Sequence, residues 1–362
     1  MDENEVLGFD PTQLSVFNQE ENAPKTNFNN NIYKTKPDDS KSEDHHYYAT
    51  IKIIYNPFDL KHSILEQQSY GLQDADGWFT VVSSLTVNDT SCPIFKAWKK
   101  CHFSEKGSDL WKQAASIEDG GKALFDKRFA RYVTIQVISD KNHPELEGKY
   151  MLWKLPKSIW ELINTKMNPS KESGKVAIPV MDFLFGRSID LEVIPGPGNP
   201  GDERYARDTK YIGELSEDVI SCTNPDGSPL LNDREQAVLD TYVTSMKEVW
   251  KEKDPTERAN KLAAINNDPN TTELRQIYAR VLENIKKFCP NLMEELSYKE
   301  WSPEVKARVQ KWIDIVLQGN SPKDGVAPTV VTEAPTPKVD ESKPTAAAPE
   351  AKYEEDNSDL PF

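Results

Sequence analysis

The stretch Tyr132-Val133-Thr134-Ile135-Gln136-Val137 places an apolar side chain at every second position. Successive side chains of a β-strand point to opposite faces, so this period of two predicts a strand whose buried face holds Val133, Ile135 and Val137. Tyr132, Thr134 and Gln136 then lie on a second, wetter face. The same alternation occurs upstream and downstream of this stretch, at residues 49–53 and 189–193.

Two further runs, residues 78–83 and 150–155, bring the number of predicted strands to five. The connections between them are too irregular in length for repeated βαβ units. We therefore predict an α+β fold built on a small, partly open five-stranded β-barrel of the OB type. Inserted helices are predicted at residues 94–113 and 157–167.

The hydrophobic period becomes helical after the Pro- and Gly-rich segment 195–201, and more clearly after residue 232. Helix starts are predicted at Asn232, Asp254-Pro255, Thr272 and Ser302-Pro303. The last part of the chain is dominated by Pro, Ala, Thr, Lys and Glu and has too few apolar side chains to form a core. The predicted organisation is a flexible acidic arm (1–46), an OB-fold core (47–213), an all-helical region (214–320) and a disordered linker with an acidic tail (321–362).

The chain has 44 Lys and Arg against 59 Asp and Glu, and its net charge of −15 argues at first against a nucleic-acid partner. The charge is distributed unevenly, however. Residues 48–212 contain 22 basic and 21 acidic side chains, whereas residues 322–362 contain 4 and 9. The core is therefore nearly neutral and can carry local basic surfaces.

No apolar run is long enough to span a membrane, and the acidic beginning of the chain lacks the positive segment of a secretory signal. The four cysteines are too few and too scattered for a disulfide framework, which is typical of a reducing compartment. We therefore expect a protein that is not secreted and has no membrane partner.

Basic residues alternate with aromatic residues at four places in the core. Single-stranded nucleic acid requires this mixture, because bases stack on aromatic rings while cations neutralise the backbone. The alternative is that the aromatic rings fill the core and the cations are merely solvated. The candidate strand-binding residues are Trp98, Lys99 and Lys100; Lys127, Arg128, Arg131 and Tyr132; Trp153 and Lys154; and Arg204, Tyr205, Arg207 and Tyr211.

The chain ends in an acidic run followed by an apolar tip, Asp359-Leu360-Pro361-Phe362. Such an end suits two tasks: competing with nucleic acid for a basic groove, and inserting Phe362 into a pocket on another protein. The alternative is a tail that only confers solubility. We predict partner binding through Asp359, Leu360, Pro361 and Phe362.

Signatures of enzymes are largely absent from the sequence. It has no phosphate-binding Gly-rich loop, no His-Glu-x2-His and no Gly-x-Ser-x-Gly motif, which predicts a non-enzymatic protein. Cys92, Cys101 and His102 are possible metal ligands, but no close cysteine pair accompanies them. We therefore predict buried or incidental thiols and no metal.

With these residues in view, residues 50–211 resemble the single-stranded DNA-binding, helix-destabilising proteins of T-even-like tailed bacteriophages. The resemblance implies an OB-fold core with a basic, aromatic-lined cleft, cooperative coating of single strands and an acidic tail that recruits replication and recombination proteins. By position, it assigns cations of the cleft to Lys127 and Arg128, and aromatic rings to Tyr132, Trp153 and Tyr205. The motifs that carry it are Gly77-Trp78-Phe79, Val82-Ser83-Ser84, Ser91-Cys92-Pro93 and the segments 127–138, 144–150 and 157–164.

The chain also departs from this family. The positions that match the family's zinc ligands are Tyr70, Val82, Cys92 and Phe95, so only Cys92 is retained and the zinc site is predicted to be lost. The family's basic N-terminal motif for cooperativity is missing. The Asp-Leu-Pro-Phe end looks more like the tip of bacterial single-strand-binding proteins, which binds partners.

Together these features predict a sequence-nonspecific protein that coats and protects single-stranded DNA and removes its secondary structure. The resemblance places it in phage DNA replication, recombination and repair, in the cytoplasm of the infected host. Its tail would recruit polymerase, a helicase or helicase loader, or recombinase, and the protein could self-associate on DNA. Two alternatives remain open: a phage scaffold or interaction protein whose barrel binds protein, and, less favoured, a nuclease.

Overall fold

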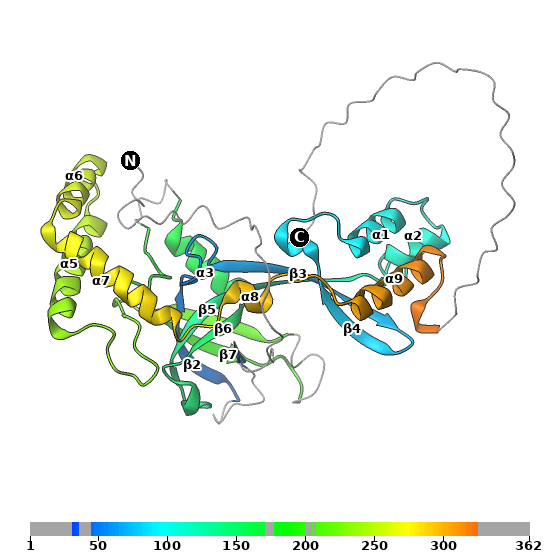
Figure 1. The fold of residues 1–362 in the computed structure, drawn as a ribbon, viewed down its shortest axis with the longest axis horizontal. Coiled ribbons are helices and arrows are strands. Elements are labelled where there is room, and N and C mark those ends of the chain that lie inside the picture. The colour runs from blue at the N-terminus through cyan, green and yellow to red at the C-terminus, as the bar shows by residue number, and fades with distance from the viewer. Residues whose placement is uncertain (1–30, 36–44, 171–176, 200–204, 206–207, 325–362) are drawn as a thin grey trace, which may run out of the picture. The chain divides into compact units, whose positions relative to one another are not determined.

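The computed structural model describes residues 31–35, 45–170, 177–199, 205 and 208–324. Helices and strands are mixed along this part of the chain, which confirms the α+β class (Figure 1). No helix among these residues is both long and apolar enough to cross a membrane. The strands are β1 (Ile32–Tyr33), β2 (Tyr47–Ile54), β3 (Ile64–Asp74), β4 (Gly77–Val82), β5 (Asp126–Asp140), β6 (Tyr150–Leu155), β7 (Ile189–Ile194) and β8 (Lys210–Leu215). The helices are α1 (Pro93–His102), α2 (Asp109–Ala114), α3 (Lys157–Met167), α5 (Asp233–Lys251), α6 (Pro255–Asn266), α7 (Pro269–Lys286), α8 (Leu292–Leu296) and α9 (Pro303–Leu317).

The long strand β5 organises the sheet. Its second half pairs with β2 and its first half with β3, while β6 pairs along residues 131–136. The order β1-β6-β5-β2-β7-β8 forms one path, and β3 and β4 form a hairpin beside it. All pairings are antiparallel except the short parallel pair of β1 and β6. Barrel closure of the OB type stays a prediction, because the path of the described strands has no pairing that joins its ends.

The prediction of five strands was wrong in number. All five are present, but the described chain also contains β1, β3 and β8. In β3 the polar run Glu66-Gln67-Gln68 interrupts the alternation, and these residues are exposed or half-buried. In β8, Gly213 interrupts the alternation of apolar side chains by which a strand is predicted. A Cβ at Gly213 would lie 2.6 Å from Cδ1 of Ile159, so the glycine allows α3 to pack closely on the strand.

Most predicted helix boundaries are confirmed. Asn232 forms a capping box with Glu235 at the start of α5, and the side chain of Ser302 caps α9. The single helix predicted at residues 94–113 is instead two, α1 and α2. Gly107 lies between them with a φ of 87°, a conformation that a helix does not tolerate. The third helix, α7, begins at Pro269 rather than Thr272.

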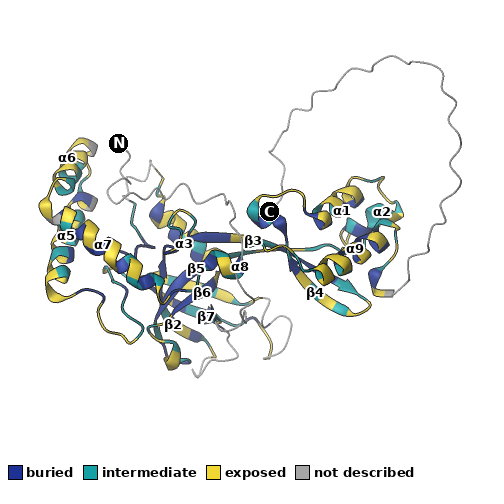
Figure 2. Cartoon of the chain, viewed as in Figure 1, coloured by how far each residue is buried: buried dark blue, intermediate teal, exposed yellow. Residues whose placement is uncertain are grey.

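The second face of the central strands is buried, contrary to the prediction of a wet face. Lys52, Thr134 and Gln136 are each fully buried. Their face is covered by an apolar cluster that includes Phe183 and side chains of α5 and α7. In Figure 2 the dark blue of buried residues marks the central strands around β5 and β6. Two of these polar groups find partners there, since the Gln136 amide donates to the carbonyl oxygen of Thr223 at 2.8 Å and the Lys52 ammonium donates to the carbonyl oxygen of Ile220. The Thr134 hydroxyl is buried without a hydrogen-bond partner among the described residues.

Helices of the predicted helical region 214–320 pack on two different parts of the described chain. Residues 214 and 215 belong to β8, and α5 and α7 pack on the central strands. By contrast, α9 packs on the β3–β4 hairpin together with α1, in a cluster that contains Tyr70, Leu72 and Trp312 (Figure 1). A helix near the end of the described chain thus buries the apolar side chains of the hairpin.

The predicted N-terminal arm, residues 1–46, includes one short strand of the described sheet. Residues 1–30 and 36–44 lie outside the described part of the chain, but β1 belongs to the sheet. The Tyr33 ring is buried, and its hydroxyl donates to the Asp140 carboxylate at 2.7 Å. Residues 325–362, which hold the predicted acidic tail, also lie outside the described residues.

Candidate nucleic-acid interface

The first half of β5 extends beyond the main core and carries exposed side chains. Lys127, Phe129 and Arg131 occupy alternate positions and therefore share one face of the strand. The Phe129 ring is 49% exposed, and Lys127 is exposed as well. We call these three residues the β5 row. The β5 row presents cation, aromatic ring and cation in sequence, spaced by two residues.

The Arg131 guanidinium lies near two aromatic rings. Its guanidinium carbon lies 5.0 Å from the centre of the Phe129 ring and 5.7 Å from that of Trp160 in α3. Its Nε donates to the carboxylate of Glu66, the residue directly opposite in β3, at 2.9 Å. Phe129 and Trp160 were both missed as site residues in the sequence. Phe129 could have been found in the sequence, because it lies two residues from both Lys127 and Arg131 and therefore on the same face of the strand.

The other predicted residues of this strand face the opposite side. Arg128 pairs with Asp126 at 2.6 Å and is exposed. Tyr132 is half-buried against a cluster that includes Leu292 and Leu296 of α8, and this burial raises the pKa of its hydroxyl. Lys154 is exposed and lies opposite Tyr132 in the register of β5 and β6. A strand of nucleic acid on one face therefore meets only two of the four cations predicted on β5 and β6.

A second aromatic surface lies on α1. The helix buries Ile94, Ala97 and Cys101, while Phe95, Trp98 and His102 follow one another along another side. The Trp98 ring stacks between Phe95, at 5.8 Å and 9°, and His102, at 4.8 Å and 14°. Phe103 meets His102 edge to face at 5.0 Å and is 76% exposed. We call Phe95, Trp98, His102 and Phe103 the α1 ladder.

The lysines of α1 differ from the arginines of β5 in their partners. Lys99 and Lys100 are exposed, and neither pairs with a carboxylate within the described part of the chain. The Lys99 ammonium lies 4.7 Å from the centre of the Phe95 ring. Arg128 and Arg131 each hold a carboxylate. A phosphate can therefore approach Lys99 and Lys100 without displacing an acidic side chain.

Two predicted aromatic residues are buried in this structure. Trp153 is 1% exposed and belongs to the main core, and Tyr205 is 6% exposed. Tyr211 is half-buried against the same core. Trp153 follows the core-facing parity of β6, because it pairs with Val133 of β5. Arg204, Arg207 and the tip Asp359, Leu360, Pro361 and Phe362 lie outside the described residues.

The positions that match the zinc ligands of the resembled family do not fit a zinc ion. They offer one thiol from Cys92, one phenol from Tyr70 and the hydrocarbon side chains of Val82 and Phe95, whereas zinc requires four Cys, His or carboxylate ligands. Tyr70 and Cys92 instead lie buried in the apolar cluster completed by Trp312. Burial also raises the pKa of the Cys101 thiol, to about 11, which disfavours the thiolate that binds metal.

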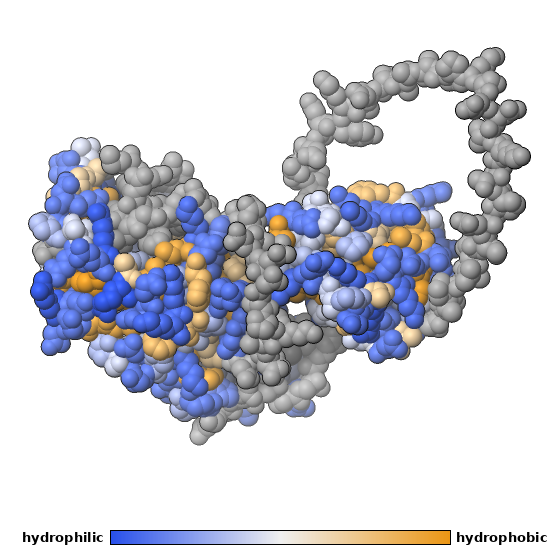
Figure 3. All heavy atoms as spheres, viewed as in Figure 1, coloured by the Kyte–Doolittle hydropathy of each residue, from blue (hydrophilic) through white to orange (hydrophobic). Residues whose placement is uncertain are grey.

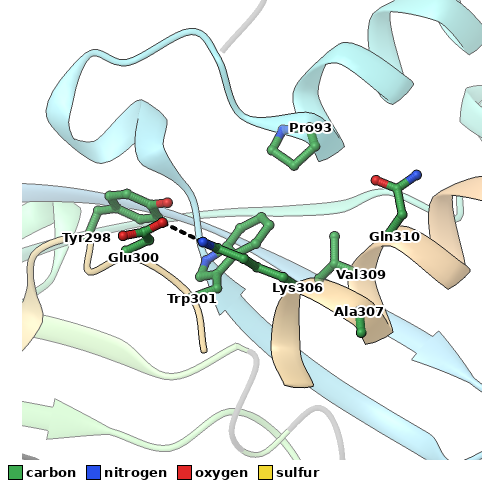
Figure 4. Close-up of a pocket in the computed structure, with 8 residues that line it drawn as sticks. All are labelled: Pro93, Tyr298, Glu300, Trp301, Lys306, Ala307, Val309 and Gln310. Atoms are coloured by element: carbon green, nitrogen blue, oxygen red, sulfur yellow. Dashed lines mark hydrogen bonds and ion pairs between the residues drawn. The ribbon is translucent and has the colours of Figure 1, made fainter. Parts of the chain in front are cut away.

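A surface pocket of about 450 Å³ lies where α9 begins, near the first residue of α1 (Figure 4). Its aromatic lining residues are Tyr298 and Trp301, and the Trp301 indole donates to the carbonyl oxygen of Val82 at 2.8 Å. Its one lysine, Lys306, is paired with Glu300. The pocket therefore has no unpaired cation, unlike α1 with its exposed Lys99 and Lys100. The face drawn in Figure 3 is mostly hydrophilic, with apolar side chains in small separate patches.

No protein-family model matches the chain. Over 183 residues it is 22% identical to the single-stranded DNA-binding proteins of Enterobacteria phage T4 and Enterobacteria phage T2. The matched stretch covers 48% of this chain and 57% of each relative, so the chain spans little more than half the length of these curated relatives. The resemblance drawn from the sequence motifs is confirmed. Both relatives are described as DNA-binding proteins, in agreement with the prediction of a non-enzymatic chain.

Proposed function

We propose that this chain is a non-enzymatic protein that binds single-stranded DNA without strong sequence preference. It coats and protects the strand and removes its secondary structure during phage DNA replication, recombination and repair, in the cytoplasm of the infected host. The observation that carries the proposal is the β5 row, where the exposed Phe129 ring lies between two cations on one face of the strand. One of these cations, Arg131, lies near both the Phe129 ring and the Trp160 ring.

The chemistry of these surfaces supports binding that reads no bases. Each base that stacks on an aromatic ring contributes roughly 1–3 kcal/mol, whichever base it is. Phe129 and Phe103 offer exposed rings for this purpose. Lys99, Lys100 and Lys127 supply positive charge to the backbone, so the affinity should fall steeply as salt is added. An OB-type core, as in the resemblance described above, would place such a row along a strand-binding face.

We also propose a role for the acidic end of the chain. Residues 354–359 carry four carboxylates and would compete with DNA for the basic surfaces at low salt. A bound strand would release the tail, and Leu360, Pro361 and Phe362 would then bind polymerase, a helicase or helicase loader, or recombinase. Self-association on DNA is part of the same proposal. Deletion of residues 354–362 should tighten binding to a single strand at low salt; unchanged affinity would contradict the competition.

The experiment that tests the function is a titration monitored by tryptophan fluorescence. Oligo-dT and a duplex of matched length are added at two salt concentrations, with the stacked Trp98 as one reporter. We expect tight, salt-sensitive binding to the single strand alone. Absence of binding at low salt, even without residues 354–362, would overturn the proposal in favour of a scaffold protein. Magnesium-dependent loss of labelled strand would indicate a nuclease instead.

A further inference from the structure

We propose that Glu66 occupies the place of a DNA phosphate on Arg131 in the free protein and thereby lowers the affinity for single strands. The inference rests on the proposed function, because it assigns a regulatory residue to the same β5 row. The strand would bind by exchange: a backbone phosphate takes the guanidinium, and the Glu66 carboxylate turns into solvent.

The geometry favours such an exchange. Glu66 and Arg131 are directly opposite each other in β3 and β5, and the Arg131 Nε lies 2.9 Å from the Glu66 carboxylate. The carboxylate side chain is 50% exposed, whereas the arginine side chain is only 26% exposed. The rings of Phe129 and Trp160 hold the guanidinium in place. The acid can therefore leave while the cation stays where a strand would meet it.

The chemistry is matched as well. A guanidinium presents its N–H groups in a planar fork, and these groups donate hydrogen bonds to a carboxylate or to a phosphate in the same way. Exposed ion pairs are weak, and breaking one costs roughly a two- to fivefold factor in an equilibrium constant. The ion pair between Glu66 and Arg131 is therefore strong enough to reduce the affinity for a single strand measurably and too weak to prevent binding.

The same strand provides a matched control on its other face. Arg128 pairs with Asp126 at 2.6 Å, and these side chains are 50% and 40% exposed. Both pairs join an arginine of β5 to a nearby carboxylate. The two pairs lie on opposite faces of β5, because successive side chains of a strand point to opposite sides and Arg128 is an odd number of residues from Phe129 and Arg131. Removal of either acid changes the net charge equally, but of the two arginines only Arg131, the partner of Glu66, lies near the exposed Phe129 ring.

The test compares Glu66→Gln with Asp126→Asn in the full chain, after thermal unfolding has shown that both variants fold. Affinity for oligo-dT is measured from about 0.1 to 0.3 M salt, where distant charges are largely screened. Glu66→Gln should bind about two- to fivefold more tightly than the unmodified protein. The slope of log affinity against log salt should stay nearly unchanged, because Arg131 contacts a phosphate in both complexes and the same number of counterions is released from the strand. Asp126→Asn should change the affinity less than Glu66→Gln does.

The decisive control is the Arg131→Gln background, in which the effect of Glu66→Gln should disappear. Equal effects of Glu66→Gln and Asp126→Asn would overturn the inference, and so would an effect of Glu66→Gln that persists without Arg131. The two proposals can fail separately. If the unmodified protein and Glu66→Gln both fail to bind oligo-dT, the proposed function is wrong; if both bind equally well, only the role of Glu66 is wrong.

Discussion

Arg308 of α9 donates two hydrogen bonds, of 2.7 and 2.8 Å, to the carboxylate of Asp74 at the end of β3, 234 positions earlier in the chain. Its guanidinium also lies 4.0 Å from the centre of the Phe79 ring in β4. One turn further on, the Trp312 indole donates to the carbonyl oxygen of Gln73 at 3.0 Å. The hairpin is thus attached to α9, and the same cluster contains the buried side of α1. The α1 ladder therefore depends on the C-terminal part of the described chain.

Replacement of Arg308 should destabilise the protein. Arg308→Met removes both hydrogen bonds to Asp74 and the contact with Phe79, which should cost about 1 kcal/mol of unfolding free energy because the pair is only partly exposed. Chemical denaturation monitored by fluorescence measures the loss. The matched control is Arg234→Met, whose side chain is 80% exposed in its pair with Glu273 and which should change the stability by only a few tenths of a kcal/mol. A larger loss in the control would contradict the prediction.

Acidification should weaken the same contact. The hydrogen bonds from Arg308 lower the pKa of Asp74 below its usual value. The folded state then binds this proton less readily than the unfolded state does, so the contribution to stability is complete above the ordinary Asp pKa of about 3.9 and is lost as the pH falls through the lower, folded value. The unfolding free energy of the unmodified protein should converge with that of Asp74→Asn below about pH 4. A constant difference between the two down to pH 2 would exclude this linkage.

Exposed rings should contribute to DNA binding without supporting the fold. Phe129→Ala and Phe103→Ala should each weaken oligo-dT binding by roughly 1–3 kcal/mol, the value of one base stack, and leave the unfolding midpoint nearly unchanged. Phe288→Ala is the control, because Phe288 is 43% exposed but follows α7 in the chain and belongs to neither the β5 row nor the α1 ladder. If all three variants bind equally well, neither the β5 row nor the α1 ladder contacts bases.

Trp153 should behave in the opposite way. Because the ring is buried in the main core, Trp153→Ala should lower the unfolding free energy by about 3–5 kcal/mol. Any loss of DNA affinity should then follow the loss of folded protein. Titration of the variant at low temperature, where enough of it remains folded, measures the two effects separately. Weakened binding by a fully folded Trp153→Ala protein would restore the ring to the interface.

The lysines of α1 should determine part of the salt dependence. Lys99→Gln and Lys100→Gln should each reduce the slope of log affinity against log salt by about 0.7, the value expected for one phosphate contact on a single strand. Lys253→Gln, an exposed lysine between α5 and α6, provides the control and should leave the slope unchanged. Equal slopes in all three variants would remove α1 from the interface.

Much of the local structure could be predicted because its causes are local. The alternation around Val133 predicted β5, because the side to which a strand residue points depends only on its immediate neighbours. Asn232 and Ser302 predicted the starts of α5 and α9, because the unpaired N–H groups of a first helical turn are capped by a residue close in sequence. The strand β3 could not be predicted in this way. Its polar side chains Glu66 and Gln67 have partners far away in the sequence, Arg131 and the carbonyl oxygen of Leu296.

The candidate site also could be predicted only where its causes are local in the sequence. Composition and spacing indicated basic and aromatic residues, and these led to Lys99, Lys127 and Arg131. They did not distinguish an exposed ring from a buried one, so Trp153 was included while Phe129 was left out. For an aromatic side chain, burial and base stacking both require an apolar face, and only the neighbours supplied by other strands and helices decide between them.

The sequence by itself determined the α+β class, most helix starts, the nearly neutral core and the similarity to phage single-stranded DNA-binding proteins. These depend on periodicity, charge and motif order, which are properties of neighbouring residues. The tertiary structure alone decided which cations share a face, which of them hold a carboxylate, and that α9 completes the hairpin carrying the buried side of α1. Those outcomes depend on contacts between residues that are distant along the chain, such as Asp74 and Arg308.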